Sequence, residues 1–177
     1  MSKRSGPGRM VLNILLVIVL VVVAIALIFV AYGRENTWVA LFGPPDLGPV
    51  DFATLRNKGL INQYLICPEG YCPAAKPAAV SPIFTVSPGE LRAAVIVAAE
   101  VDDRVVQVSG EGEEELRFVA RSNLMRYPDT VSVRVLPAEG GSTLAIYSRS
   151  QIGRSDFGVN KARIERWLER IRQAVGG

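Results

Sequence analysis

A long apolar run near the N-terminus limits what this chain can fold into more than any other feature. The run, from Met10 to Gly33, contains no charged residue, and Asn13 is its only strongly polar one. As a helix, its apolar part is roughly 30 Å long, which matches the hydrocarbon thickness of a bilayer. A helix that is apolar on every side is insoluble in water, and a chain of 177 residues has little core in which to bury it. We therefore interpret residues 10–33 as a transmembrane helix.

The alternative for this run is a secretory signal peptide that is removed by cleavage. Ala31-Tyr32-Gly33 is a weak match to the small-x-small cleavage site. The apolar cores of cleaved signals are shorter, however, at about 7–15 residues. We favour an uncleaved signal anchor, and both interpretations export the rest of the chain.

The charges on either side of the run predict its orientation. Lys3, Arg4 and Arg9 precede it, whereas Arg34 is followed at once by Glu35. Basic flanking residues stay on the cytoplasmic side of a membrane. We expect residues 1–9 to be a cytoplasmic basic tail, residues 10–33 to cross a bacterial inner membrane once, and the remaining chain to be periplasmic.

The charge distribution argues against a nucleic-acid-binding protein. The tail carries the whole net charge of +3, because the other 17 basic residues are matched by 17 acidic ones. A nucleic-acid-binding domain needs a basic face with a net excess of Lys and Arg. We expect no nucleic acid among the partners.

The chain contains no histidine. This removes the usual general base near neutral pH and the commonest metal ligand. Neither a Ser-His-Asp nor a Cys-His site can be built from this chain alone. We predict no catalytic residue, no metal and no cofactor, and we lean towards a protein that is not an enzyme.

Two cysteines, Cys67 and Cys72, lie five residues apart in the segment "CPEGYC". Outside the cytoplasm, two nearby thiols tend to pair, and Gly70 between them favours a turn. We favour a small-loop disulfide over two free thiols. A redox or metal role is the third alternative, although the CxxC spacing and further metal ligands are missing.

The region after the membrane divides into two parts. Residues 34–80 read as a Pro-rich tether and lead-in, ordered only where it docks on a folded domain, since six prolines interrupt any long element. Residues 81–177 read as that domain. Apolar residues alternate with polar ones in the way of half-buried strands, and these strands are expected at 81–86, 103–110, 115–122, 130–137 and 142–150.

Two helices complete the predicted domain. Ser87, Pro88 and Glu90 form the start of the first, as a capping box with proline at its first position. Asn160 is expected to cap the last helix, which carries one apolar stripe. Its opposite, solvated face is expected to contain six charged residues: Arg163, Glu165, Arg166, Glu169, Arg170 and Arg172.

Short connections between successive strands predict antiparallel pairing, and one face of such a sheet needs a cover. The sequence therefore predicts an α+β fold. After the N-terminal transmembrane helix comes one antiparallel sheet of about five strands, with two helices packed on one face.

Two polar, Arg-rich segments lie at the ends of predicted strands, at residues 121–130 and 147–168. If the strands pair, their ends bring several arginines towards one edge, and arginine forks suit carboxylate or phosphate. The candidate ligand-binding residues are Arg121, Arg126, Arg149, Arg154, Ser150 and Asp156.

A structural role is the favoured alternative for the same residues. Arg154 has Asp156 and Asp129 as potential ion-pair partners, and Asp156 can cap the turn before the last helix. A carboxylate-dependent hydrolase using Asp129 or Asp156 is the least favoured alternative, because no nucleophile is paired with a base.

The segments "RFVARSNLMRYPDTVSVRV" and "IYSRSQIGRSDFGVNKARIERWL" resemble domain-of-unknown-function family fourteen-ninety-nine of bacteria and plastids. The resemblance extends over about Ile83 to Ile171, and the piece from Gly153 to Asn160 is quite specific. It implies one α+β domain, often exported or membrane-tethered, and transfers no catalytic residues. Many relatives read Arg-Ser-x-Ser-Arg where this chain has Tyr147 to Gln151, and "ICPEGYC" replaces their Cys-Pro…Asn-Cys-Val-Ser segment.

We thus expect a membrane-anchored periplasmic domain that is a non-enzymatic envelope accessory or binding protein. The alternative is an Arg-based binding module for an anionic ligand or lipid headgroup. The expected partners are the membrane, through residues 10–33, and either another envelope protein or an anionic lipid.

Overall fold

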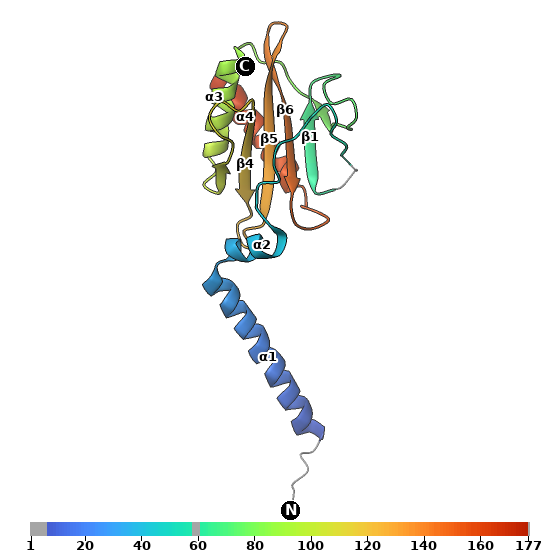
Figure 1. Cartoon of the computed structure of the whole chain (residues 1–177), viewed down its shortest axis with the longest axis vertical. Coiled ribbons are helices and arrows are strands. Elements are labelled where there is room, and N and C mark those ends of the chain that lie inside the picture. The colour runs from blue at the N-terminus through green and yellow to red at the C-terminus, as the bar shows by residue number, and fades with distance from the viewer. Residues whose placement is uncertain (1–6, 58–60, 177) are drawn as a thin grey trace, which may run out of the picture. The chain divides into compact units, whose positions relative to one another are not determined.

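A computed structural model describes residues 7–57 and 61–176, in which the chain forms four helices and six strands (Figure 1). The chain divides into two compact units, residues 1–41 and residues 42–177. The elements are α1 Pro7–Tyr32, α2 Arg34–Phe42, β1 Gln63–Cys67, β2 Ala79–Val80, α3 Pro88–Glu100, β3 Val105–Gln107, β4 Glu115–Arg121, β5 Pro128–Ala138, β6 Gly141–Ser150 and α4 Val159–Val175.

The first unit consists of α1 and most of α2. No α1 residue is buried, and the mean hydropathy of its most apolar stretch is 3.7, so this helix is long and apolar enough to span a membrane. Gly33 separates the helices with a φ of 93°, a left-handed conformation that glycine adopts without strain. The Phe29 and Trp38 rings meet edge to face across this break, 5.3 Å between centroids.

The second unit is an α+β domain, which confirms the predicted fold class. Its strands form one sheet in the order β2-β1-β6-β5-β4-β3. In this order, each strand from β1 through β6, β5 and β4 to β3 pairs antiparallel with the next, as predicted. The edge strand β2 runs parallel to β1. The sheet therefore has six strands rather than about five, and it is mixed.

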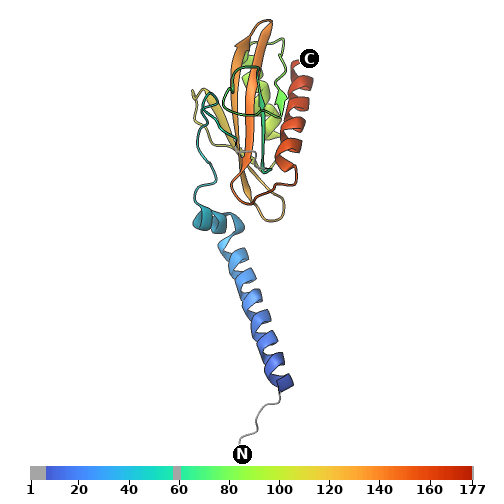
Figure 2. The same cartoon turned by 90° about the vertical axis from the view of Figure 1, so that its right-hand side faces the viewer.

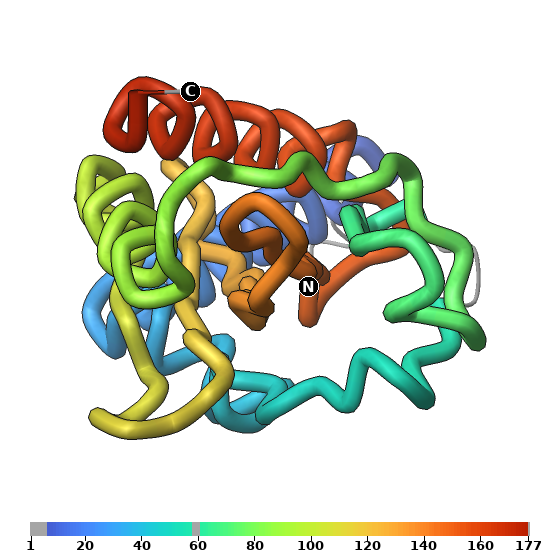
Figure 3. Tube along the Cα trace, turned by 90° about the horizontal axis from the view of Figure 1, so that it is seen from above, coloured from blue at the N-terminus to red at the C-terminus, as the bar shows by residue number. Residues whose placement is uncertain are grey.

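The sheet lies between two covering layers (Figures 2 and 3). The helices α3 and α4 pack on one face, as predicted, and close the main core around Trp167, Phe118 and Leu91. On the other face, the lead-in before β1 places Val50 and Phe52 against a smaller cluster. The lead-in is thus the second layer of the domain over part of the sheet.

Three local expectations differ from the structure. Residues 81–86 are not a strand, and Phe84 makes only an isolated bridge to Ser142. Two strands come instead from residues expected to be lead-in, β1 and β2. Arg163, expected on the solvated face of α4, is only 5 % exposed.

Cys67 and Cys72 form a disulfide that closes a turn directly after β1, with 6.3 Å between their Cα atoms. Both are buried in the smaller cluster. The double substitution Cys67→Ser and Cys72→Ser should lower the free energy of unfolding by about 2 kcal/mol, the chain-entropy value for so short a loop. Urea unfolding of the full chain in neutral detergent measures this. Equal stability of the parent with and without a reducing agent would argue that the bridge contributes nothing.

Candidate functional site

The predicted arginines do not converge on one site. Arg149 donates from Nη2 to the backbone carbonyl oxygens of Leu47 and Gly48, at 3.1 Å each, and its guanidinium lies 5.6 Å from the Tyr147 ring centroid. Burial raises the pKa of the Tyr147 hydroxyl, although Arg149 opposes the shift. Arg149 therefore fixes the lead-in on the sheet.

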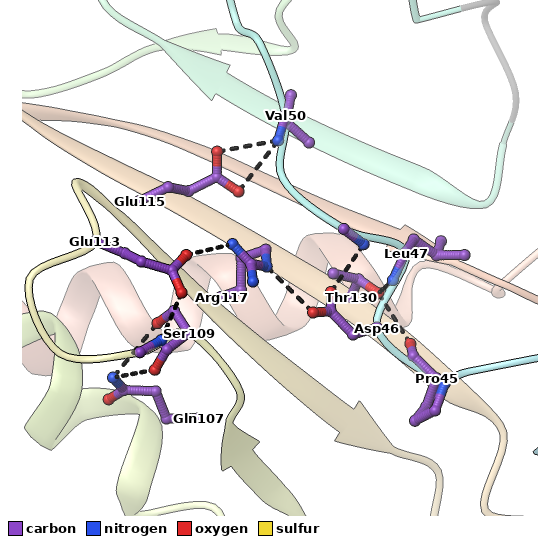
Figure 4. A network of polar contacts seen from close by, with 12 residues as sticks. Pro45, Asp46, Leu47, Val50, Gln107, Ser109, Glu113, Glu115, Arg117 and Thr130 are labelled. Atoms are coloured by element: carbon purple, nitrogen blue, oxygen red, sulfur yellow. Dashed lines mark hydrogen bonds and ion pairs between the residues drawn. The ribbon is translucent and has the colours of Figure 1, made fainter.

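The same face carries a chain of polar contacts that continues this docking (Figure 4). Arg117 of β4 bonds Asp46 of the lead-in at 3.2 Å and Glu113 at 2.7 Å. The Glu115 carboxylate, 7 % exposed as a residue, accepts the backbone N–H of Val50 with both oxygens. These charges are paired with each other and with the backbone, so this face is a structural interface rather than an open site.

Ser150 and Asp156 also have structural partners. Asp156 accepts the N–H of Gly158 at 3.0 Å and that of Asn160 at 2.9 Å, so it caps α4. The N-cap position belongs to Gly158, with a φ of 81°, and not to Asn160 as predicted. Ser150 accepts a hydrogen bond from the Asn160 side chain at 3.0 Å. Arg154 is exposed, and within residues 7–57 and 61–176 its side chain forms no hydrogen bond or ion pair.

A buried polar cluster joins α4 to the sheet. Arg163 bonds Asp129 of β5 at 2.7 Å, and both are more than nine-tenths buried. Its other amino group donates to Ser148 at 2.9 Å and to Asn160 at 2.7 Å, while Ser148 also bonds Asn160. Asn160 in turn donates to the carbonyl oxygen of Asn62.

This cluster was not predicted from the sequence, although the spacing of its residues along α4 indicates it. Asn160 and Arg163 precede Ile164 and Trp167 at the three- and four-residue spacing of one helix face. Arg163 therefore extends the apolar stripe of α4, where a charge must find a partner. Asp129 is that partner, and Asp156 accepts backbone N–H groups at the start of α4, so both carboxylates of the hydrolase alternative have structural partners.

A second group of arginines surrounds a cavity of about 320 Å³, which Arg163 also lines. We call it the arginine pocket. It lies between α4, β3 and the end of β4. Its charged lining residues are Asp102, Arg104, Arg121, Arg163 and Arg166.

Two of those charges are already balanced. Arg163 pairs with Asp129, and Asp102 pairs with Arg170 at 2.9 Å while accepting the Trp167 indole N–H at 3.1 Å. Burial alone would raise the pKa of Asp102, but these hydrogen bonds and the nearby guanidinium groups of Arg170 and Arg166 lower it. Asp102 therefore stays ionised near neutral pH and cannot serve as a proton donor there.

Arg104 and Arg166 supply the remaining positive charge. Within the part of the chain that the structure describes, neither side chain forms a hydrogen bond or an ion pair, although Arg166 is attracted by Asp102. Arg104 is half-buried and Arg166 is exposed. Neither one was predicted from the sequence, because Arg104 precedes β3 whereas Arg166 lies in α4, with the strands from β3 to β6 between them in the chain.

The model of a protein family of unknown function, DUF1499, matches residues 62–171. The chain belongs to this family. The match begins at Asn62, earlier than the residues that carry the sequence resemblance, and so includes β1. The arginine pocket and the buried polar cluster both lie inside the DUF1499 region, whereas the lead-in at residues 42–57 precedes it.

Two solved structures are similar to this chain. Protein MLL2253 from Mesorhizobium loti is 10 % identical, with a TM-score of 0.42, and the alignment covers 55 % of this chain and 94 % of that one. Protein CV1439 from Chromobacterium violaceum is 8 % identical, with a TM-score of 0.40, covering 65 % and 96 %. No curated protein matches the sequence.

In the described residues, no group of three or more Cys, Asp or Glu side chains is placed to hold a metal ion. The arginine pocket brings guanidinium groups together, and the Ser122 hydroxyl is among its lining residues. Guanidinium groups suit the oxygens of phosphate or carboxylate, and the chain has no histidine that could activate Ser122.

Proposed function

We propose that this DUF1499 member is a single-pass, membrane-anchored domain that binds an anionic group in the arginine pocket without catalysing a reaction. The observation that carries the proposal is the surplus of guanidinium groups there. Four arginines and one aspartate line the pocket; Arg163 is paired with Asp129 and the aspartate with Arg170, so the surplus rests on Arg104 and Arg166. An envelope accessory role would follow from binding an anionic component of the membrane or of a neighbouring protein.

The geometry favours phosphate or carboxylate over other ligands. A guanidinium presents a planar fork of N–H donors that matches two oxygens of either group. Arg104 is half-buried, and Coulomb attraction between charges is stronger near a low-dielectric wall than in bulk water. Arg166 belongs to α4, a helix joined to the sheet by the Asp129–Arg163 ion pair.

Binding can be measured on the full chain in neutral maltoside micelles, with inorganic phosphate as the probe. Arg104→Gln combined with Arg166→Gln should weaken phosphate binding about tenfold or more, because each charged hydrogen bond contributes over 1 kcal/mol. NMR shifts of the arginine side-chain N–H groups report the binding.

The matched control removes two exposed arginines outside the pocket, Arg154→Gln with Arg172→Gln, and leaves the same net charge. It should retain the parent affinity. Equal phosphate affinity of both double variants and the parent would refute the arginine pocket as the site.

We propose further that the domain faces the periplasm. Three basic residues before the apolar run that begins at Met10 support this, because basic flanks stay in the cytoplasm. The Cys67–Cys72 disulfide supports it too, because disulfides persist outside the cytoplasm. An alkaline phosphatase reporter fused after Gly177 should be active in bacterial cells. An inactive alkaline phosphatase fusion, together with an active fusion of a cytoplasmic reporter at the same position, would contradict the periplasmic placement.

A further inference from the structure

A second cavity adjoins the arginine pocket. It measures about 320 Å³ and shares Ser122 and Val159 with the arginine pocket as lining residues. We call it the apolar pocket. Its lining is mostly apolar surface, from Tyr127, Ile152, Phe157 and Val159.

The polar groups of the apolar pocket are largely occupied by the protein itself. Asp129 pairs with Arg163, and Asp156 caps α4. Ser150 accepts from Asn160, and Ser155 accepts the backbone N–H of Phe157 at 3.2 Å. The apolar pocket therefore presents mainly hydrocarbon surface to a ligand, whereas the arginine pocket presents guanidinium groups.

Phe157, which lines this pocket, combines high exposure to solvent with a left-handed backbone conformation. Its side chain is 95 % exposed, and its backbone has a φ of 53°. A bulky residue other than glycine in this left-handed conformation costs free energy and is often found at ligand-binding positions. The turn that caps α4 thus holds a large aromatic ring in water beside an apolar cavity.

The apolar pocket also lies at the end of the domain where the chain enters it. Gln151, next to Ile152, donates from its side chain to the carbonyl oxygens of Phe42 at 3.0 Å and Pro44 at 2.8 Å. Phe42 follows the last residue of α1, Tyr32, by only ten positions. If α1 crosses a bilayer, this short connection tethers the domain to a membrane whose lipids are amphiphiles.

We propose that the two cavities together bind one anionic amphiphile, a phospholipid of the membrane that anchors the chain. Its phosphate contacts Arg104 and Arg166, and part of one acyl chain fills the apolar pocket against Ile152 and Phe157. Each cavity has the volume of a small ligand site, so only a segment of the acyl chain is held. This inference rests on the proposed function and adds the class of ligand to it.

The test uses the full chain in phosphatidylcholine nanodiscs that contain a small fraction of lipid with a photoreactive diazirine on the acyl chain. One arm carries the probe on phosphatidylglycerol, a second on phosphatidylcholine, and a third adds a diazirine fatty acid. Mass spectrometry of peptides then locates the adducts. Adducts on residues 10–32 measure exposure to bulk lipid in every arm.

We expect adducts on Tyr127, Ile152 or Phe157 with phosphatidylglycerol, about tenfold above phosphatidylcholine after normalisation to residues 10–32. Arg104→Gln with Arg166→Gln should abolish that excess. Pocket adducts with the fatty acid but none with phosphatidylglycerol would overturn the phospholipid and assign the pocket to a free amphiphile. Equal pocket labelling by both phospholipids, or labelling confined to residues 10–32 in all arms, would overturn the inference.

The variant Phe157→Gly separates this inference from the proposed function. Glycine fits a φ of 53°, so the fold is kept, and the arginine pocket is unchanged. We expect normal binding of inorganic phosphate but a loss of most pocket adducts at Ile152. Phosphate binding by the parent without any pocket adducts would leave the anion site standing and refute the amphiphile.

Discussion

The substitution Arg163→Met should lower the free energy of unfolding by about 3–5 kcal/mol, because it leaves the Asp129 carboxylate buried without its counter-charge. Arg163 and Asp129 have side chains only 6 % and 8 % exposed. The same guanidinium also donates to Ser148 and Asn160, which would lose their donor. Urea unfolding of the full chain in neutral micelles, followed by Trp fluorescence, measures the loss.

Two further variants show whether the buried charge is the cause. Lys161→Met removes a cation on the same helix whose 3.8 Å pair with Glu165 is exposed, and it should cost no more than about 0.5 kcal/mol. Arg163→Met combined with Asp129→Leu removes both charges and should recover at least part of the lost stability. A double variant less stable than Arg163→Met alone would contradict this explanation.

Gly141→Ala is expected to be about as damaging, at roughly 3 kcal/mol or more, because it overpacks a backbone contact. Gly141 begins β6 with a φ of 153°. An added Cβ would collide with the Phe84 carbonyl oxygen and lie 3.0 Å from its carbon and 3.1 Å from Thr85 Cα. The backbone bonds between Phe84 and Ser142, at 2.7 Å and 2.9 Å, would then break.

The neighbouring glycine provides the control. Gly140 has a φ of 81°, but an added Cβ would meet no atom within 4 Å. Gly140→Ala should therefore cost only the backbone strain, about 1 kcal/mol. Amide hydrogen exchange at Ser142 should accelerate in Gly141→Ala and remain slow in Gly140→Ala, and the same exchange rate in both would rule out the collision.

Local signals accounted for much of the fold. The capping box at Ser87 and Glu90 is present, and four strands lie within or next to the predicted segments. β1 and β2 could not be found in the same way, since prolines surround them and neither shows alternation. β1 takes its conformation from pairing with β6, and β2 from pairing with β1, and no window of a few residues contains that information.

The candidate site was harder to predict than the fold. Arg149 and Arg163 look alike in the sequence as exposed, cationic positions, but the first holds the lead-in carbonyls and the second a buried carboxylate. The arginine pocket brings together Arg104 and Arg166 from separate elements, so its charge surplus exists only after α4 packs beside β3. Spacing along a chain cannot reveal a cluster of this kind.

The docking of the lead-in has a consequence for when the domain can fold. Gln151 bonds Phe42 across 109 positions, Arg149 bonds Gly48 across 101, and β1 pairs only with β6 among the longer strands. Chains are made from the N-terminus, so these early segments wait for β6 to be synthesised. Contacts this distant in sequence slow the search for the native state. Folding should therefore be late and all-or-none, and a ribosome stalled before β6 would hold a nascent chain whose β1 has no strand to join.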